Sequence, residues 1–189
     1  QALNDVTFKM RGPELVGLIG PNGAGKTTLT NVLDGVIKPS SGTVYLNGQR
    51  IDTLPPYYVA RSGLGRTFQV TRAFRRMTVL ENMLVPALAV PSDRGQREIR
   101  ERAREILNFL TMDHLRNDYA RSLSGGQQKL LELGQLLMTD PVLLMLDEPS
   151  LGLAPKLVEL VFDTLDKINE SGITILLVEQ NVASALRHC

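Results

Sequence analysis

The chain has 189 residues, of which 43% are hydrophobic and 22% charged, and its single cysteine is Cys189. This composition is typical of one globular domain and excludes a disordered chain, a collagen-like repeat, a disulfide framework and a cysteine-based zinc site. The 21 basic and 20 acidic residues give a net charge of +1, so no overall field favours direct contact with nucleic acid.

The first third of the chain has the pattern of strands and turns. Strands are predicted at Val6–Phe8, which alternates, and at Leu15–Ile19, an apolar run typical of a buried parallel strand. Gly42–Leu46 indicates another strand, closed by the turn signal Asn47-Gly48. A short strand is predicted at Leu64–Phe68.

The middle of the chain has helical character. Thr78 and Glu81 predict a capping box at the start of the first helix. A second helix is indicated by one apolar stripe, formed by Ile99, Ala103, Ile106, Leu107 and Leu110. A third, leucine-rich helix is predicted from about 125 to 138.

The last third alternates strand and helix again. Val142–Leu146 and Ile173–Val178 are uninterrupted apolar runs typical of buried parallel strands, and Leu157–Ile168 between them is helical. The pattern predicts an α/β fold with a mainly parallel sheet and an inserted helical subdomain. Residues 1–69, with an N-terminal β portion, and residues 138–189 would form the core, and residues 70–137 the helical subdomain.

A phosphate-binding loop is predicted after the strand at Leu15–Ile19. The run Gly20-Pro-Asn-Gly-Ala-Gly25-Lys26-Thr27 fits G-x-x-x-x-G-K-[ST] between a strand and a helix. Glycines let backbone N–H groups turn toward phosphate oxygens, and the helix adds its positive N-terminus. Lys26 is placed to reach β- and γ-phosphates, and the Thr27 hydroxyl to bind Mg²⁺. The predicted nucleotide site comprises Asn22, Gly23, Ala24, Gly25, Lys26, Thr27 and Thr28.

Two acids, Asp147 and Glu148, follow the apolar run Leu143–Leu146. A buried parallel strand presents such residues at the ligand-binding edge of its sheet. Asp147 is placed to hold Mg²⁺, directly or through water, and Glu148 to orient or deprotonate a water molecule. An acid pair after a strand is by itself more often a surface turn. Combined with the phosphate loop, it favours a nucleotide-hydrolysing site.

A second candidate anion site is the run Leu123-Ser-Gly-Gly-Gln127. Ser124 suits the N-cap of a helix, and the two glycines leave backbone N–H groups uncovered. From the residues alone, a simple helix cap and an anion site are equally good interpretations.

In this order and spacing, the phosphate loop, the Leu-Ser-Gly-Gly-Gln run and the Leu-Leu-Met-Leu-Asp-Glu run resemble the nucleotide-binding subunits of ATP-binding cassette (ABC) transporters. The resemblance covers essentially the whole chain and implies an ATPase that uses ATP and Mg²⁺. It also implies a head-to-tail dimer with a second ATPase subunit, identical or different. Ser124, Gly126 and Gln127 would then contact the γ-phosphate of ATP held by the partner.

The resemblance implies further roles. Gln69 resembles the Q-loop glutamine, a catalytic residue that senses Mg²⁺ and the attacking water, and Ser150–Leu153 resembles the D-loop. After the last strand the family usually has a histidine that contacts the γ-phosphate, whereas this chain has Gln180. Glutamine donates a hydrogen bond but does not titrate near neutrality, so we expect Glu148 to be the base and Gln180 a donor.

Four segments are similar to the ATPases of branched-chain amino-acid importers: Gly65–Gln69, Arg75–Asn82, Ser150–Pro155 and Leu177–Asn181. Importers of urea or other amides share much of this pattern. Such a subunit would lie at the cytoplasmic face of the inner membrane, peripheral to permease subunits and indirectly linked to a substrate-binding protein. One alternative is a soluble ABC ATPase acting on nucleic acid or ribosomes, although those usually carry two cassettes or a long coiled-coil insert. A non-hydrolytic binding module is a third interpretation, favoured only by Gln180.

Arginine is concentrated in residues 61–105, with ten Arg, no Lys and five acids. The family receives a coupling helix from the membrane subunit near the Q-loop, so we expect permease subunits to contact Gln69–Met77. For Arg94–Arg104 we expect a solvated helix face, supported by neighbouring acids.

The ends of the chain lack family features. Phe8, only twelve residues before Gly20, is interpreted as a core residue rather than an adenine-stacking one. Family members extend further in both directions, so we expect a chain shortened at both ends. No apolar run reaches the roughly 18–20 residues that span a bilayer, and the start shows no signal peptide, which makes the cytosol the default compartment.

Overall fold

The computed structural model describes residues 3–67, 73–89 and 94–180. Within these residues the main sheet has four parallel strands, in the order β1 (Leu15–Ile19), β6 (Thr174–Glu179), β5 (Leu143–Asp147) and β4 (Leu64–Arg66). Because the strands are parallel, the segments that follow them emerge at one edge of the sheet. The predicted parallel α/β core is confirmed.

The remaining elements in chain order are α1 (Lys26–Leu33), β2 (Tyr45–Leu46), β3 (Gln49–Arg50), α2 (Pro56–Arg61), α3 (Val79–Ala89), α4 (Gln96–Phe109), η1 (Asp113–Leu115), η2 (Ala120–Ser122), α5 (Gly125–Leu137) and α6 (Pro155–Glu170).

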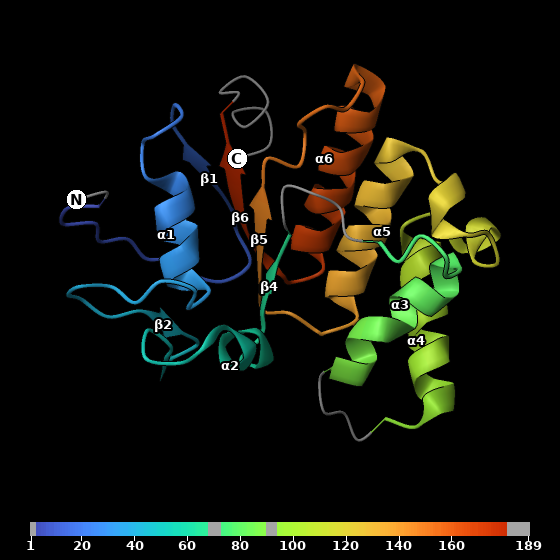
Figure 1. The fold of residues 1–189 in the computed structure, drawn as a ribbon, viewed down its shortest axis with the longest axis horizontal. Coiled ribbons are helices and arrows are strands. Elements are labelled where there is room, and N and C mark those ends of the chain that lie inside the picture. The colour runs from blue at the N-terminus through green and yellow to red at the C-terminus, as the bar shows by residue number, and fades with distance from the viewer. Residues whose placement is uncertain (1–2, 68–72, 90–93, 181–189) are drawn as a thin grey trace.

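The two faces of the sheet bury alternate residues of the central strands. Leu144 and Leu146 of β5 pack into the larger cluster, which includes residues of α3, α4, α5 and α6. Met145, between them, packs with Ile51 and Val59 on the opposite face. Figure 1 shows α5 and α6 on one side of the sheet and α1 and α2 toward the other. This two-sided burial explains the continuous apolar runs in the sequence.

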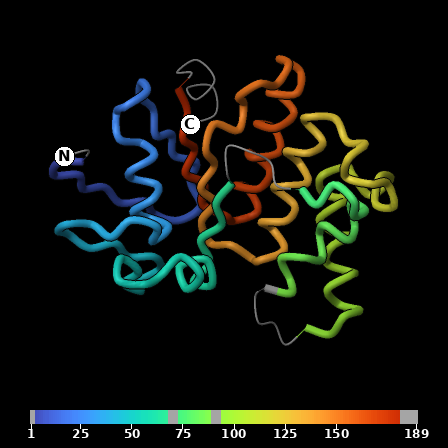
Figure 2. The backbone as a smooth tube through the Cα atoms, viewed as in Figure 1, coloured from blue at the N-terminus to red at the C-terminus, as the bar shows by residue number. Residues whose placement is uncertain are grey.

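Helices α3, α4 and α5 lie between β4 and β5 in the chain; α5 contacts β4, and Figure 2 shows α3 and α4 farther from the sheet. The predicted capping box is present, since Thr78 N donates to Glu81 Oε2 at 2.7 Å and Glu81 N to Thr78 Oγ1 at 3.2 Å. The predicted stripe of α4 lies inward, with Ala103, Ile106, Leu107 and Leu110 buried and Ile99 partly buried.

Two predictions about Val6–Phe8 are wrong. Val6–Phe8 does not form a strand, because no strand of the described residues pairs with it, and Phe8 is 48% exposed rather than in the core. The strand predicted from Gly42 is shorter, since only Tyr45–Leu46 pairs with Gln49–Arg50. The turn between them is as predicted, with positive φ at Asn47 and Gly48 (48° and 78°).

None of the helices in the described part of the chain combines the length and hydropathy required to cross a bilayer.

Candidate active site

The loop after β1 curls around the ammonium group of Lys26. Gly25 adopts a left-handed backbone (φ 90°) just before α1, a conformation that glycine accepts without strain. Lys26 is 8% exposed, and its Nζ donates to the carbonyl oxygens of Gly20 (2.6 Å) and Pro21 (3.0 Å). The sequence therefore places a buried positive charge at the start of a helix, where backbone N–H groups also point outward.

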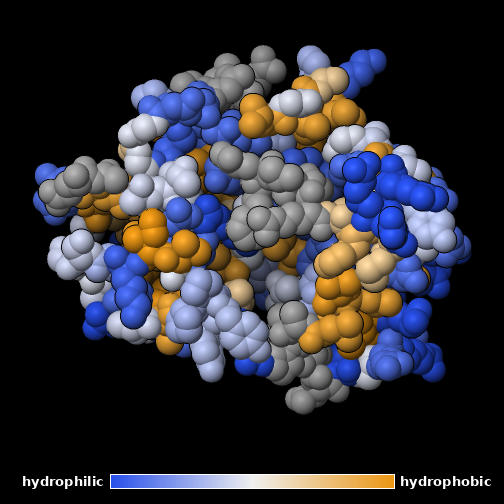
Figure 3. Space-filling view, viewed as in Figure 1, coloured by the Kyte–Doolittle hydropathy of each residue, from blue (hydrophilic) through white to orange (hydrophobic). Residues whose placement is uncertain are grey.

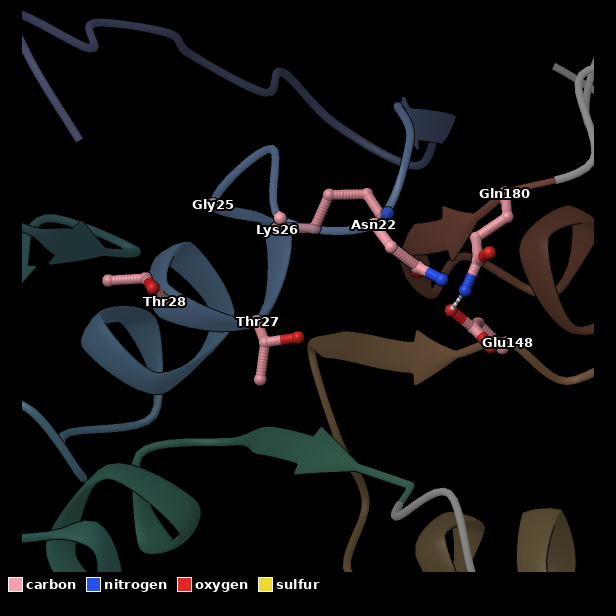
Figure 4. Close-up of a pocket in the computed structure, with 8 residues that line it drawn as sticks. Asn22, Gly25, Lys26, Thr27, Thr28, Glu148 and Gln180 are labelled. Carbon is pink, nitrogen blue, oxygen red and sulfur yellow. Dashed lines mark hydrogen bonds between the residues drawn. The ribbon is translucent and has the colours of Figure 1, made fainter. Parts of the chain in front are cut away.

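A pocket of about 210 Å³ joins this loop to the ends of β5 and β6. Its lining residues are Asn22, Gly23, Gly25, Lys26, Thr27, Thr28, Glu148 and Gln180. Of the residues predicted for the nucleotide loop, Ala24 is not part of the lining. In Figure 4 the Thr27 hydroxyl points toward the β5 side of the site, while Glu148 and Gln180 converge from the neighbouring strand ends.

Glu148 and Gln180 form a direct hydrogen bond, in which Gln180 Nε2 donates to Glu148 Oε1. Glu148 is 8% exposed, whereas Gln180 is exposed. The backbone of Glu148 is in the left-handed region (φ 49°), and its N–H donates to the carbonyl of Val178 on β6 at 2.8 Å. The carboxylate at the pocket is thus fixed by both its backbone and Gln180.

Asp147 lies at the end of β5 and is 6% exposed. Its backbone N–H donates to Thr67 Oγ1 at 3.2 Å. Burial raises the pKa of the Asp147 carboxyl above its usual range, and the charge of Glu148 adds to this effect, while Arg66 and Lys26 oppose it. A cation beside this carboxylate would relieve the penalty of burying it.

The sequence pattern did not identify Arg66 as a residue near the site. Its side chain is 11% exposed and lies near Asp147, with Nη2 at 3.6 Å from Asp147 Oδ2. Arg66 lies in the Arg-rich stretch of residues 61–105, so its local composition gives no sign of a buried position. Only the pairing of β4 with β5, which sets Arg66 opposite Met145, brings it to Asp147.

The donor chemistry at Thr27 and Asp147 fits Mg²⁺. Both offer oxygen, the ligand that Mg²⁺ prefers, and Mg²⁺ commonly takes one or two carboxylates together with substrate phosphates and water. The described residues contain no cluster of three or more His, Cys, Asp or Glu that could hold a metal ion. Gln69, the third predicted metal residue, lies outside the described residues.

Ser150, in the predicted D-loop, is hydrogen-bonded to the end of β6. Its Oγ donates to Glu179 Oε1 at 2.7 Å, and Glu179 is 2% exposed. Since Gln180 follows Glu179, the D-loop and the donor to Glu148 are anchored on the same strand end.

The Leu-Ser-Gly-Gly-Gln run forms the cap of α5 and lies outside the pocket. Ser124 N donates to Gln127 Oε1 at 2.8 Å, and Gln127 N donates to Ser124 Oγ at 3.4 Å. A Cβ on Gly126 would lie 2.8 Å from Leu157 Cδ2, so α5 packs closely on α6 there. The structure thus does not bring Ser124, Gly126 and Gln127 to the nucleotide loop of the same chain.

Comparison with known proteins gives concordant matches to a family model, a curated relative and solved structures. The family model described as ABC transporter matches residues 3–151. The high-affinity branched-chain amino acid transport ATP-binding protein LivG of Escherichia coli strain K12 is 40% identical over 96% of the chain and 76% of its own length.

Two solved structures extend the match. The ADP conformation of MJ1267, an ATP-binding cassette of an ABC transporter, superposes with a TM-score of 0.91 at 36% identity, over 99% of the chain and 78% of that protein. A dimeric post-hydrolysis state of the cassette MJ0796, bound to ADP and Pi, superposes with a TM-score of 0.81 at 28% identity, over 97% and 82%.

Proposed function

The chain belongs to the ABC transporter family, and on that premise we propose that it is the ATP-hydrolysing subunit of an importer for branched-chain amino acids. The observation that carries hydrolysis is that one pocket joins Lys26 and Thr27 to Glu148 and Gln180. The solute is supported by the relative LivG and its stated role in branched-chain amino acid transport.

The phosphates of ATP are expected to lie along the loop before α1. Lys26 Nζ now donates to two neutral carbonyls, and a γ-phosphate offers it a charged acceptor that forms a stronger hydrogen bond. The positive N-terminus of α1 attracts the same phosphates. Thr27 and Asp147 would hold Mg²⁺, which when bound neutralises part of the phosphate charge.

We expect Glu148 to act as the general base. Its carboxylate lies in the pocket and accepts a hydrogen bond from Gln180, which orients it without taking its proton-accepting role. The amide of Gln180 has a second hydrogen, and this can donate to the γ-phosphate. Because glutamine does not titrate near neutrality, any basic limb in the pH profile of hydrolysis would come from other groups.

A second cassette would complete the site. Ser124, Gly126 and Gln127 lie outside the pocket of their own chain, so they would serve the ATP held by a partner subunit. ABC cassettes form dimers, as the MJ0796 structure with ADP and Pi illustrates. We expect two ATP molecules to be held between two subunits.

The surface beside α3 is the proposed contact with the permease subunits. Phe74 is 49% exposed and Leu88 on α3 is 84% exposed, and Figure 3 shows apolar surface gathered over α3. The segment from Phe74 to Thr78 is fixed to α3, because the side-chain amide of the fully buried Asn82 donates to the carbonyls of Phe74 and Thr78. Of the predicted contact Gln69–Met77, residues 73–77 are described. Such a contact would place the chain peripherally at the cytoplasmic face of the membrane.

Replacing Glu148 by glutamine tests the proposed hydrolysis. The amide has nearly the shape of the carboxylate but cannot accept the proton of the attacking water, so ATP binding should persist while turnover falls by about 10²–10⁴-fold. Turnover is measured as phosphate release by the complete transporter, with dimer formation in ATP measured by light scattering.

The matched control is Glu159→Gln, which removes an exposed carboxylate on α6 and should leave the rate unchanged. Near-normal turnover by Glu148→Gln would exclude Glu148 as the base.

For the solute, a substrate-binding protein loaded with leucine should stimulate ATP hydrolysis by the reconstituted transporter, whereas stimulation by urea alone would assign an amide importer instead.

A further inference from the structure

Arg66 connects the two residues expected to hold Mg²⁺. On one side its Nη2 lies 3.6 Å from Asp147 Oδ2. The same nitrogen donates to Thr30 Oγ1 at 3.0 Å, and that hydroxyl donates to the carbonyl of Thr27 at 3.1 Å. An unbroken series of polar contacts therefore runs from the end of β5, through Arg66, to the first turn of α1.

The other side of the guanidinium is fixed to α1. Nη1 donates to Asn31 Oδ1 at 2.8 Å and pairs with the carboxylate of Asp34, which caps the helix. The side chains of Arg66 and Asp34 are each 11% exposed, and that of Asp147 is 8% exposed. One planar cation thus lies between two buried carboxylates on different elements.

We propose that Arg66 is a positioning residue for the Mg²⁺ site, which sets the separation between Thr27 on α1 and Asp147 on β5. The inference rests on the proposed function, because it assumes that these two residues share the metal of a bound nucleotide. The ion pair with Asp34 links β4 to α1 but involves neither Thr27 nor Asp147. The additional contacts to Asp147 and Thr30 direct the guanidinium at the metal-binding groups.

The planar guanidinium is what suits Arg66 to this task. Arginine presents several N–H donors in a fixed fork, so it spans groups on two elements at once. Lysine would keep the positive charge near Asp147 but offers a single ammonium on a flexible stem. Glutamine would remove the charge and leave Asp34 and Asp147 without it. The two substitutions therefore separate the charge of Arg66 from its geometry.

The test measures binding of a non-hydrolysable β,γ-imido analogue of ATP by calorimetry, first in EDTA and then across a Mg²⁺ series. We expect Arg66→Gln to raise the Mg²⁺ concentration needed for half-maximal tightening by about 10–100-fold, the usual effect of removing a group that orients a metal ligand. Affinity in EDTA should change by less than about threefold, because the phosphate loop is intact. Arg66→Lys should lie between Arg66→Gln and the unmodified chain.

Arg50→Gln is the matched control, since it breaks another Arg–Asp ion pair, with Asp52 at 3.0 Å in the β2–β3 hairpin, remote from the pocket. It should leave the Mg²⁺ midpoint unchanged. Thermal unfolding establishes which variants are folded. If Arg66→Gln does not fold, the Mg²⁺ midpoint of Arg66→Lys decides the test.

Three outcomes would count against these ideas. If folded Arg66 variants keep the Mg²⁺ midpoint of the unmodified chain, the role of Arg66 is overturned. It is equally overturned if affinity falls by the same factor in EDTA and in Mg²⁺, since that indicates general loosening. If the unmodified chain binds the analogue no better with Mg²⁺ than with EDTA, the proposed function itself fails.

Discussion

Replacing Gln180 by alanine removes the hydrogen bond that its Nε2 donates to the Glu148 carboxylate. A hydrogen bond to a charged group contributes about 1.5–3 kcal/mol. Because Gln180 is exposed, water can replace part of the lost interaction, so the lower end of the range applies. At about 1.4 kcal/mol per factor of ten, the expected decrease in the hydrolysis rate is roughly tenfold.

The assay is steady-state ATP hydrolysis by the complete transporter at saturating ATP. Gln49→Ala, which truncates an exposed glutamine on β3, serves as the control and should retain the normal rate. Gln180→His should retain or raise the rate, since imidazole also donates a hydrogen bond. The unmodified chain should show no titration step assignable to position 180. A normal rate for Gln180→Ala would refute the reasoning.

Two further predictions concern the phosphate loop and the β2–β3 hairpin. Lys26→Ala should weaken ATP binding itself by about 10–100-fold, because it deletes the charge facing the β- and γ-phosphates, and unchanged affinity by calorimetry would contradict this. Arg50 and the backbone N–H of Val44 hold the pKa of Asp52 at about 2, below the unfolded value of about 3.9. The Asp52 carboxylate therefore stabilises the fold above about pH 4, and this stabilisation is lost as the pH falls through about 2. Asp52→Asn should lower the unfolding temperature at neutral pH, with the difference shrinking toward pH 2; a difference independent of pH would show that the charge of Asp52 is not responsible.

The parts of the site that follow strands could be predicted from the sequence. The loop at Gly20 and the acids at Asp147 are adjacent to apolar runs that fix their strands, so their meeting at one sheet edge follows from parallel topology. The placement of Gln180 beside Glu148 needed the resemblance to a family, because strand order is not encoded in any local pattern.

Where prediction failed, long-range contacts decided the outcome. The alternation at Val6–Phe8 does not depend on a pairing partner elsewhere in the chain. The sequence therefore could not reveal that none of the described strands pairs with this segment. Arg66 resembles its exposed neighbours Arg75 and Arg76 in local composition, yet its partners Asp34 and Asp147 lie far from it along the chain.

The left-handed backbone at Glu148 sets stability against turnover at a single position. A non-glycine residue in that conformation costs roughly 1–2 kcal/mol relative to ordinary geometry, and glycine would be relieved of much of it. Laboratory evolution of this chain for heat resistance alone would therefore enrich Glu148→Gly and erase the proposed base. Selection for hydrolysis would restore the glutamate. At the turn after β5, ATP hydrolysis and thermal stability therefore favour different residues.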